Sequence, residues 1–183
     1  GRYVLALAKV APDCGEYARL RDRAFTDVLT RAAPAHDAGM LVMPNSILMK
    51  PDALDRDELA IVQQHTTIGA QIMADAANRW AGAAAELAMA ADIARGHHEK
   101  WDGTGYPDGL AGTQIPLAAR VVAITSVYEL LRTARPHRPA FSHNHAARLI
   151  TTDSVGEFDP TLVEAFAATG AKFDEIFRAG KRY

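Results

Sequence analysis

The sequence has little cysteine, little net charge and no long apolar run, and each absence excludes a class of protein. Cys14 is the only cysteine, so neither a disulfide framework nor a thiolate zinc site can form within one chain. The net charge of −2 gives no bulk electrostatic sign of nucleic-acid binding. No apolar run approaches the roughly 20 residues that span a bilayer, and no signal peptide is visible. We therefore expect a cytoplasmic protein without DNA binding or membrane insertion.

The size and composition are those of one globular domain over residues 1–183. Hydrophobic residues make up 49% of the chain and charged residues 23%, which is a soluble balance. There is no internal repeat and no low-complexity linker. The chain begins abruptly, with Arg2, Tyr3 and Val4 already in a helical pattern. It is expected to be the output domain of a longer protein.

Helical patterns dominate the sequence, which predicts an all-α fold. The alanine-rich stretch 83–94 favours helix, and no segment alternates with the period of a strand. Asp55 is expected to start a helix through a near capping box with Glu58. The predicted helices cover residues 2–12, 16–33, 55 onward, 83–98, 116–131, 142–150 and 159–179, with loops over 44–51 and 99–115.

Two of these segments carry a functional signal. Ile61, His65, Ile68 and Ile72 follow helical spacing, which predicts that His65 lies in an apolar stripe facing the core. The loop 99–115 holds several glycines and Pro107, and a loop of that length in a compact domain is typical of a functional segment.

A candidate metal site combines four of the seven histidines with one aspartate. These residues lie on three separate helical segments, which a helical bundle can bring together around one point. Imidazole and carboxylate ligands without sulfur suit iron, manganese, zinc, nickel or cobalt. A carboxylate can also bridge two metals roughly 3.5–4 Å apart. The candidate ligands are His36, Asp37, His65, His97 and His98.

Each of these residues has a simpler interpretation when taken alone. His65 would then be a hydrogen-bonded core histidine. The pair His97 and His98 would be a helix C-terminus, where imidazolium favours the dipole, and His36 with Asp37 an ordinary helix end. Taken together with their neighbours, they favour a metal site. His137, His143 and His145 are interpreted as surface or loop residues.

The segments around these residues closely resemble one known family. They include AHDAG at 35–39, PNSILMKP at 44–51, HTTIGA at 65–70, HHEKWDGTGYPDGL at 97–110, IP at 115–116, ARVVA at 119–123, RPHR at 135–138 and FDP at 158–160. This pattern resembles the HD-GYP family, a branch of the HD phosphohydrolases. The likeness covers nearly the whole chain, and the stretch 97–116 is its most specific part.

The resemblance implies a fold and an activity. The family has an all-helical HD bundle with extra HD-GYP helices and a long Gly-rich loop, and it holds two or three metal ions, often iron or manganese. Its members hydrolyse cyclic di-GMP to the linear dinucleotide pGpG or to GMP. The five candidate ligands named above fall on family metal-ligand positions.

The resemblance also implies substrate and partner contacts. Arg135 and Arg138 fall where the family places basic residues near the substrate phosphates. Gly105, Tyr106 and Pro107 fall in the loop tied to substrate access and to docking with diguanylate cyclase domains. An upstream receiver or sensory domain would match the family habit of serving as a two-component output domain in signal transduction.

Three departures from the family pattern concern the metal site. Met40 replaces a lysine and cannot donate a hydrogen bond. Ser126 replaces an aspartate ligand, and the first-helix ligands would precede Tyr3. One well-held metal is therefore expected on Asp37, His65, His97 and His98, and a second that is weak or absent. Glu129, three residues after Ser126, is a possible replacement ligand, or else a solvated or salt-bridged surface residue.

Three functions remain open at this level. The first is a weak, metal-dependent cyclic di-GMP phosphodiesterase, favoured by the surviving ligands with Arg135 and Arg138. The second is a catalytically inactive cyclic di-GMP sensor or protein-docking module, favoured by Met40 and Ser126. The third is an HD phosphohydrolase of another nucleotide, which the intact loop at 105–107 argues against. The first is preferred, because hydrolysis of cyclic di-GMP is the activity of the family that the sequence resembles.

Overall fold

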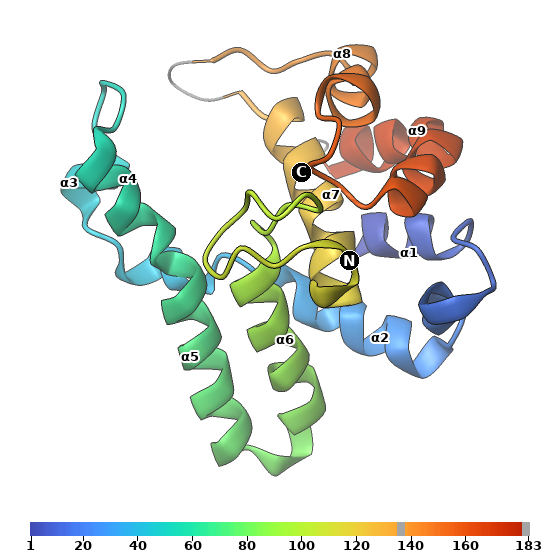
Figure 1. The fold of residues 1–183 in the computed structure, drawn as a ribbon, viewed down its shortest axis with the longest axis horizontal. Coiled ribbons are helices and arrows are strands. Elements are labelled where there is room, and N and C mark those ends of the chain that lie inside the picture. Colours follow the sequence, from blue (N-terminus) through green and yellow to red (C-terminus); the bar gives the residue numbers. More distant parts are fainter. Residues whose placement is uncertain (135–137, 181–183) are drawn as a thin grey trace.

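The computed structural model describes residues 1–134 and 138–180, and every regular element in these residues is a helix (Figure 1). The all-α prediction is confirmed. No helix in the described residues is long and apolar enough to cross a membrane. The α-helices are α1 (Arg2–Ala8), α2 (Arg23–Ala32), α3 (Asn45–Leu48), α4 (Arg56–Gln63), α5 (His65–Arg79), α6 (Ala84–Gly96), α7 (Leu117–Arg132), α8 (His143–Arg148) and α9 (Pro160–Gly180). Shorter helical turns are η1 (Gly15–Leu20), η2 (Ala33–Ala35), η3 (Ala38–Val42), η4 (Ala81–Ala83), η5 (Gly112–Gln114) and η6 (Leu149–Asp153).

Several helices begin at residues whose side chains cap them. The Asp55 carboxylate accepts hydrogen bonds from the Asp57 and Glu58 N–H groups, and Glu58 accepts one from the Asp55 N–H in return. Ser142 accepts from the His145 N–H at the start of α8. Such caps typically contribute about 1 kcal/mol each. The predicted capping box and the predicted Ser142 cap are both confirmed.

Three local expectations were wrong. Residues 16–33 do not form one helix, because the Asp22 side chain accepts the Ala24 N–H and starts α2 afresh after η1. The expected loop 44–51 contains the one-turn helix α3. The helix from Asp55 breaks at Gln64. The predicted burial of His65 is confirmed, but Ile61 and Ile72 of the same predicted stripe are 37% and 39% exposed.

Helix α5 buries small side chains instead of the predicted isoleucines. Its buried residues are His65, Thr66, Gly69 and Ala70. Gly69 lies against Gly39 of η3, and the Ala94 side chain of α6 is also close to it. Small residues let backbones approach closely, so α5 and α6 run side by side (Figure 1), and η3 packs against α5. This close packing brings the residues before η3 next to the first turn of α5.

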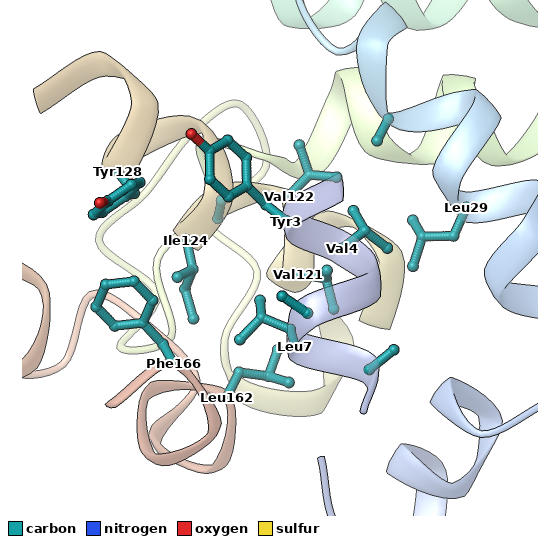
Figure 2. Close-up of a cluster of buried hydrophobic side chains, with 14 of the residues drawn as sticks. Tyr3, Val4, Leu7, Leu29, Val121, Val122, Ile124, Tyr128, Leu162 and Phe166 are labelled. Carbon is teal, nitrogen blue, oxygen red and sulfur yellow. The ribbon is translucent and has the colours of Figure 1, made fainter. Parts of the chain in front are cut away.

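The hydrophobic core surrounds α7. Figure 2 shows side chains of α1, α2, α7 and α9 meeting in one cluster. The labelled members are Tyr3, Val4, Leu7, Leu29, Val121, Val122, Ile124, Tyr128, Leu162 and Phe166. Helix α7 is buried along most of its length, so core packing fixes its position. The same packing fixes the position of the α7 residues that point away from the core.

Candidate metal centre

The candidate ligands come from the ends of helices that converge. His36 is the C-cap of η2, Asp37 precedes η3, and His65 is the first residue of α5. His97 is the C-cap of α6, followed directly by His98. One ligand atom from each of Asp37, His65, His97 and His98 lies within 4.8 Å of the others. Segments far apart in sequence thus bring four of the five candidate ligands to one point, and the His36 Nε2 lies 3.3 Å from Asp37 Oδ2.

Backbone carbonyls determine which nitrogen of each imidazole carries the proton. The Nδ1 atoms of His36, His65 and His97 lie 3.0, 2.7 and 3.0 Å from the carbonyl oxygens of Ala33, Val62 and Ile93, three or four residues earlier in the chain. A carbonyl can only accept, so each Nδ1 donates and, in the neutral ring, each Nε2 keeps its lone pair. This is the arrangement that orients metal-binding histidines.

The three Nε2 atoms face the carboxylate of Asp37. Those of His65 and His97 are both 3.4 Å from Asp37 Oδ1, and both are buried without a hydrogen-bond partner. The Asp37 side chain is 53% exposed, so its carboxylate is ionised near neutral pH. Lone pairs that face an anion repel it unless a positive charge lies between them. The donor set therefore fits a divalent metal ion.

His98 is held in the neutral form that binds metals. Burial, with the neighbouring His97 and His65, lowers the pKa of His98 to about 3. Its ring stacks on that of Tyr106, with the centroids 4.8 Å apart and the planes 16° from parallel. Tyr106 therefore fixes the plane of the His98 imidazole from the loop side.

The loop between α6 and α7 is held by a buried carboxylate that the sequence reasoning missed. Glu99 is 4% exposed, and its two oxygens accept the N–H groups of Asp108 and Leu110 at 2.7 and 3.0 Å. A Cβ on Gly105 would overlap the backbone of Lys100, so only glycine allows the loop to fold back here. An acidic residue at the start of a glycine-rich loop was the available signal, because such a carboxylate can bind several backbone N–H groups.

A cavity of about 420 Å³ opens beside the histidines. Met40, Ser126 and Glu129 line it together with the five candidate ligands and Tyr106. The Ser126 hydroxyl donates to the Ala123 carbonyl at 3.1 Å, so its proton is directed into its own helix. Glu129 lies on the same wall of the cavity, one helical turn after Ser126. The two positions that depart from the family pattern therefore belong to the same cavity as the histidines.

The remaining predicted residues are not among those that line this cavity, or they fall outside the described residues. Arg135 and His137 fall outside the described residues. Arg138 donates to the Leu130 carbonyl at 2.6 Å and lies over the Phe141 ring, at the C-terminal end of α7. The surface interpretation of His143 was wrong, because this half-buried ring is hydrogen-bonded to the Tyr128 hydroxyl. His145 is exposed on α8.

Comparison with known proteins places the chain in a family. Residues 3–162 match the family described as HD domain. A cyclic di-GMP phosphodiesterase of Vibrio cholerae is 44% identical over 174 residues, which are 95% of this chain and 35% of that protein. The 3'3'-cGAMP-specific phosphodiesterase 2 of Vibrio cholerae is 35% identical over 158 residues, which are 85% of this chain and 29% of that protein. The chain therefore spans about a third of the length of these relatives.

A solved structure has the same fold. An HDG"Y"P protein from Bdellovibrio bacteriovorus superposes with a TM-score of 0.61 at 20% identity, over 96% of this chain and 51% of that one. At that identity the likeness concerns the fold alone. The chain belongs to the HD domain family. Within that family it is a member of the HD-GYP branch, as the sequence motifs predicted.

Replacing Gly39 by alanine is expected to destabilise the protein by about 3 kcal/mol, the upper end of typical overpacking costs. A Cβ at this position would overlap the His65 carbonyl oxygen and crowd the Gly69 nitrogen, and backbone atoms cannot rotate away. Urea unfolding followed by circular dichroism measures the change. Gly82→Ala is the matched control, because a Cβ there meets nothing within 4 Å. Equal stability of the two variants would contradict the packing argument.

Proposed function

We propose that this chain is a metal-dependent phosphodiesterase domain that hydrolyses cyclic di-GMP to pGpG or GMP. One observation carries the proposal: the buried Nε2 atoms of His65 and His97 face the ionised carboxylate of Asp37, which a divalent cation would stabilise. The names of relatives at 44% and 35% identity support a cyclic dinucleotide as the substrate class. Since the chain spans about a third of those proteins, the activity needs a direct test.

The donor atoms suggest which metal is bound and how many ions. Nitrogen and oxygen donors without sulfur favour iron or manganese, while zinc, nickel or cobalt remain compatible. Asp37, His65, His97 and His98 would hold the first ion, and His36 with Asp37 would contribute to a second. A bound divalent ion would polarise a phosphate oxygen and lower the pKa of a bound water molecule.

The chain's own residues would orient these groups. Asp37 supplies the negative charge between the imidazoles, and Tyr106 holds His98 in plane through their stacked rings. Glu99 fixes the loop that carries Tyr106. Arg138, at the C-terminal end of α7, is proposed with Arg135 to approach the substrate phosphates. Met40 gives the cavity an apolar side chain where a donor is needed, and a lost charge-stabilising group commonly costs on the order of 10²-fold in rate.

Product chromatography tests the proposal. The purified chain, loaded with manganese or ferrous iron, is incubated separately with cyclic di-GMP and with 3'3'-cGAMP. We expect linear product from cyclic di-GMP, lost in His98→Ala and retained in the control His145→Ala, whose ring is exposed on α8. Faster cleavage of 3'3'-cGAMP would move the assignment to the other cyclic dinucleotide.

A cyclic di-GMP sensor without turnover is the second candidate. It is favoured by Met40 and Ser126, because both line the cavity beside the histidines and neither carries charge. Calorimetric titration with cyclic di-GMP separates the two functions. Saturable binding with no product would assign the sensor role, whereas product formation would exclude it.

A further inference from the structure

The two oxygens of Asp37 face different imidazoles. Oδ1 lies 3.4 Å from the Nε2 atoms of both His65 and His97, whereas Oδ2 lies 3.3 Å from the Nε2 of His36. The His36 Nδ1 donates to the Ala33 carbonyl, so its Nε2 also presents a lone pair. Asp37 therefore offers one oxygen to each of two groups of imidazole nitrogens, and His36 with Oδ2 would be the ligands of a second cation.

Ser126 is a poor third ligand for that second position. Its hydroxyl is neutral and donates to the Ala123 carbonyl. A divalent ion held by one imidazole and one shared carboxylate needs further negative charge or further donors. The wall that α7 contributes to the cavity must supply them if the position is to be occupied.

Glu129 is the carboxylate on that wall. It lies one turn after Ser126 on α7 and lines the same cavity as His36 and Asp37. Among the described residues, no hydrogen bond or ion pair of its carboxylate is found. Long side chains on a helix lean back over the preceding turn, which directs Glu129 towards Ser126.

We infer that Glu129 completes a second metal position with His36 and Asp37, in place of the carboxylate that Ser126 lacks. The inference deepens the proposed function, because it assumes that the first position holds a metal ion. Glu129 also lines a second cavity with Gly1 and Arg2, but no ion pair of its carboxylate is found in the part of the chain that the structure describes. In this arrangement the Glu129 carboxylate, one helical turn after Ser126, takes the place of the shorter aspartate side chain that the family has at that position.

Manganese loading of the purified protein tests this inference without an activity assay. The metal-free protein is titrated with Mn²⁺, bound metal is counted by elemental analysis, and electron paramagnetic resonance distinguishes isolated from spin-coupled ions. We expect two ions per chain and a coupled signal in the unmodified protein. Glu129→Gln should bind one ion per chain with an isolated signal, because the amide keeps the size of the side chain and removes its charge.

Two further variants sharpen the test. Glu164→Gln removes another exposed glutamate, on α9, and should keep two ions. Ser126→Asp combined with Glu129→Gln should restore the second ion, because it returns a carboxylate to the same wall. Retention of two ions by Glu129→Gln, or a single ion in the unmodified protein, would overturn the inference and leave the proposed function standing. A protein that binds no manganese, ferrous iron or zinc would overturn both.

Discussion

Replacing His97 by alanine is expected to abolish binding at the first metal position and, with it, the stabilisation of the fold by metal. The His97 side chain is 1% exposed, and its Nε2 faces Asp37 with no other partner. Mutation of partners that only orient a metal ligand already costs about 10–100-fold in affinity. Loss of a ligand should cost more than about 100-fold.

Thermal unfolding with and without manganese measures this effect. At a metal concentration of 100 times Kd, binding to the folded state alone stabilises it by about 2.7 kcal/mol. For a chain of this size that raises Tm by roughly 5–10 °C. We expect this rise in the unmodified protein and in His145→Ala, and no rise in His97→Ala at the same metal concentration.

A second variant distinguishes loss of a metal ligand from a failure of the His97→Ala variant to fold. Asp37→Asn keeps the size of a half-exposed side chain and removes its charge, so the protein should fold and also lose the rise in Tm. If both His97→Ala and Asp37→Asn are stabilised by manganese as strongly as the unmodified protein, the metal is bound elsewhere and the site is wrongly assigned.

Replacing Arg120 by alanine is expected to destabilise the fold by about 3–5 kcal/mol. The Arg120 side chain is 2% exposed and pairs at 2.7 Å with Asp159, whose side chain is 0% exposed. The same guanidinium donates to the Ile115 carbonyl at 2.9 Å and pairs with Glu16. Truncation leaves the Asp159 charge buried without its cation, with Tyr17 as a remaining side-chain donor.

Denaturant unfolding tests this prediction against two controls. Arg23 pairs with Asp27 at the surface, with side chains 94% and 53% exposed, so Arg23→Ala should cost less than about 1 kcal/mol. Arg120→Met combined with Asp159→Asn removes both charges and should be more stable than Arg120→Met alone. If the double variant is the less stable of the two, the cost does not come from an unpaired buried charge.

The local features of the fold were predictable because they depend on near neighbours in the chain. The capping box at Asp55 and the cap at Ser142 need only residues within one helical turn, so the pattern of residues was enough to find them. The stripe through Ile61 and Ile72 failed for a complementary reason. Helical periodicity shows which residues share a face, but the packing partners decide which face is buried, and α5 packs through Gly69 and Ala70.

The features of the candidate metal site also fall into those that the sequence predicted and those that it did not. The identity of the candidate ligands and the glycine-rich loop could be read from residue types and motifs. The role of Glu99 was missed, because its partners are backbone N–H groups 9 and 11 residues further along the chain. The burial of His143 was also missed, because its partner Tyr128 lies on another helix.

By itself, the sequence determined the helical class, the helix starts at Asp55 and Ser142, and the set of nitrogen and oxygen donors available to a metal. These depend on local hydrogen bonding and on the chemistry of individual side chains. Only the tertiary structure decided that the Nε2 atoms of His65 and His97 share one oxygen of Asp37 while His36 faces the other. It also decided that Glu129 lines their cavity, because the distance between residues on different helices is set by how those helices pack.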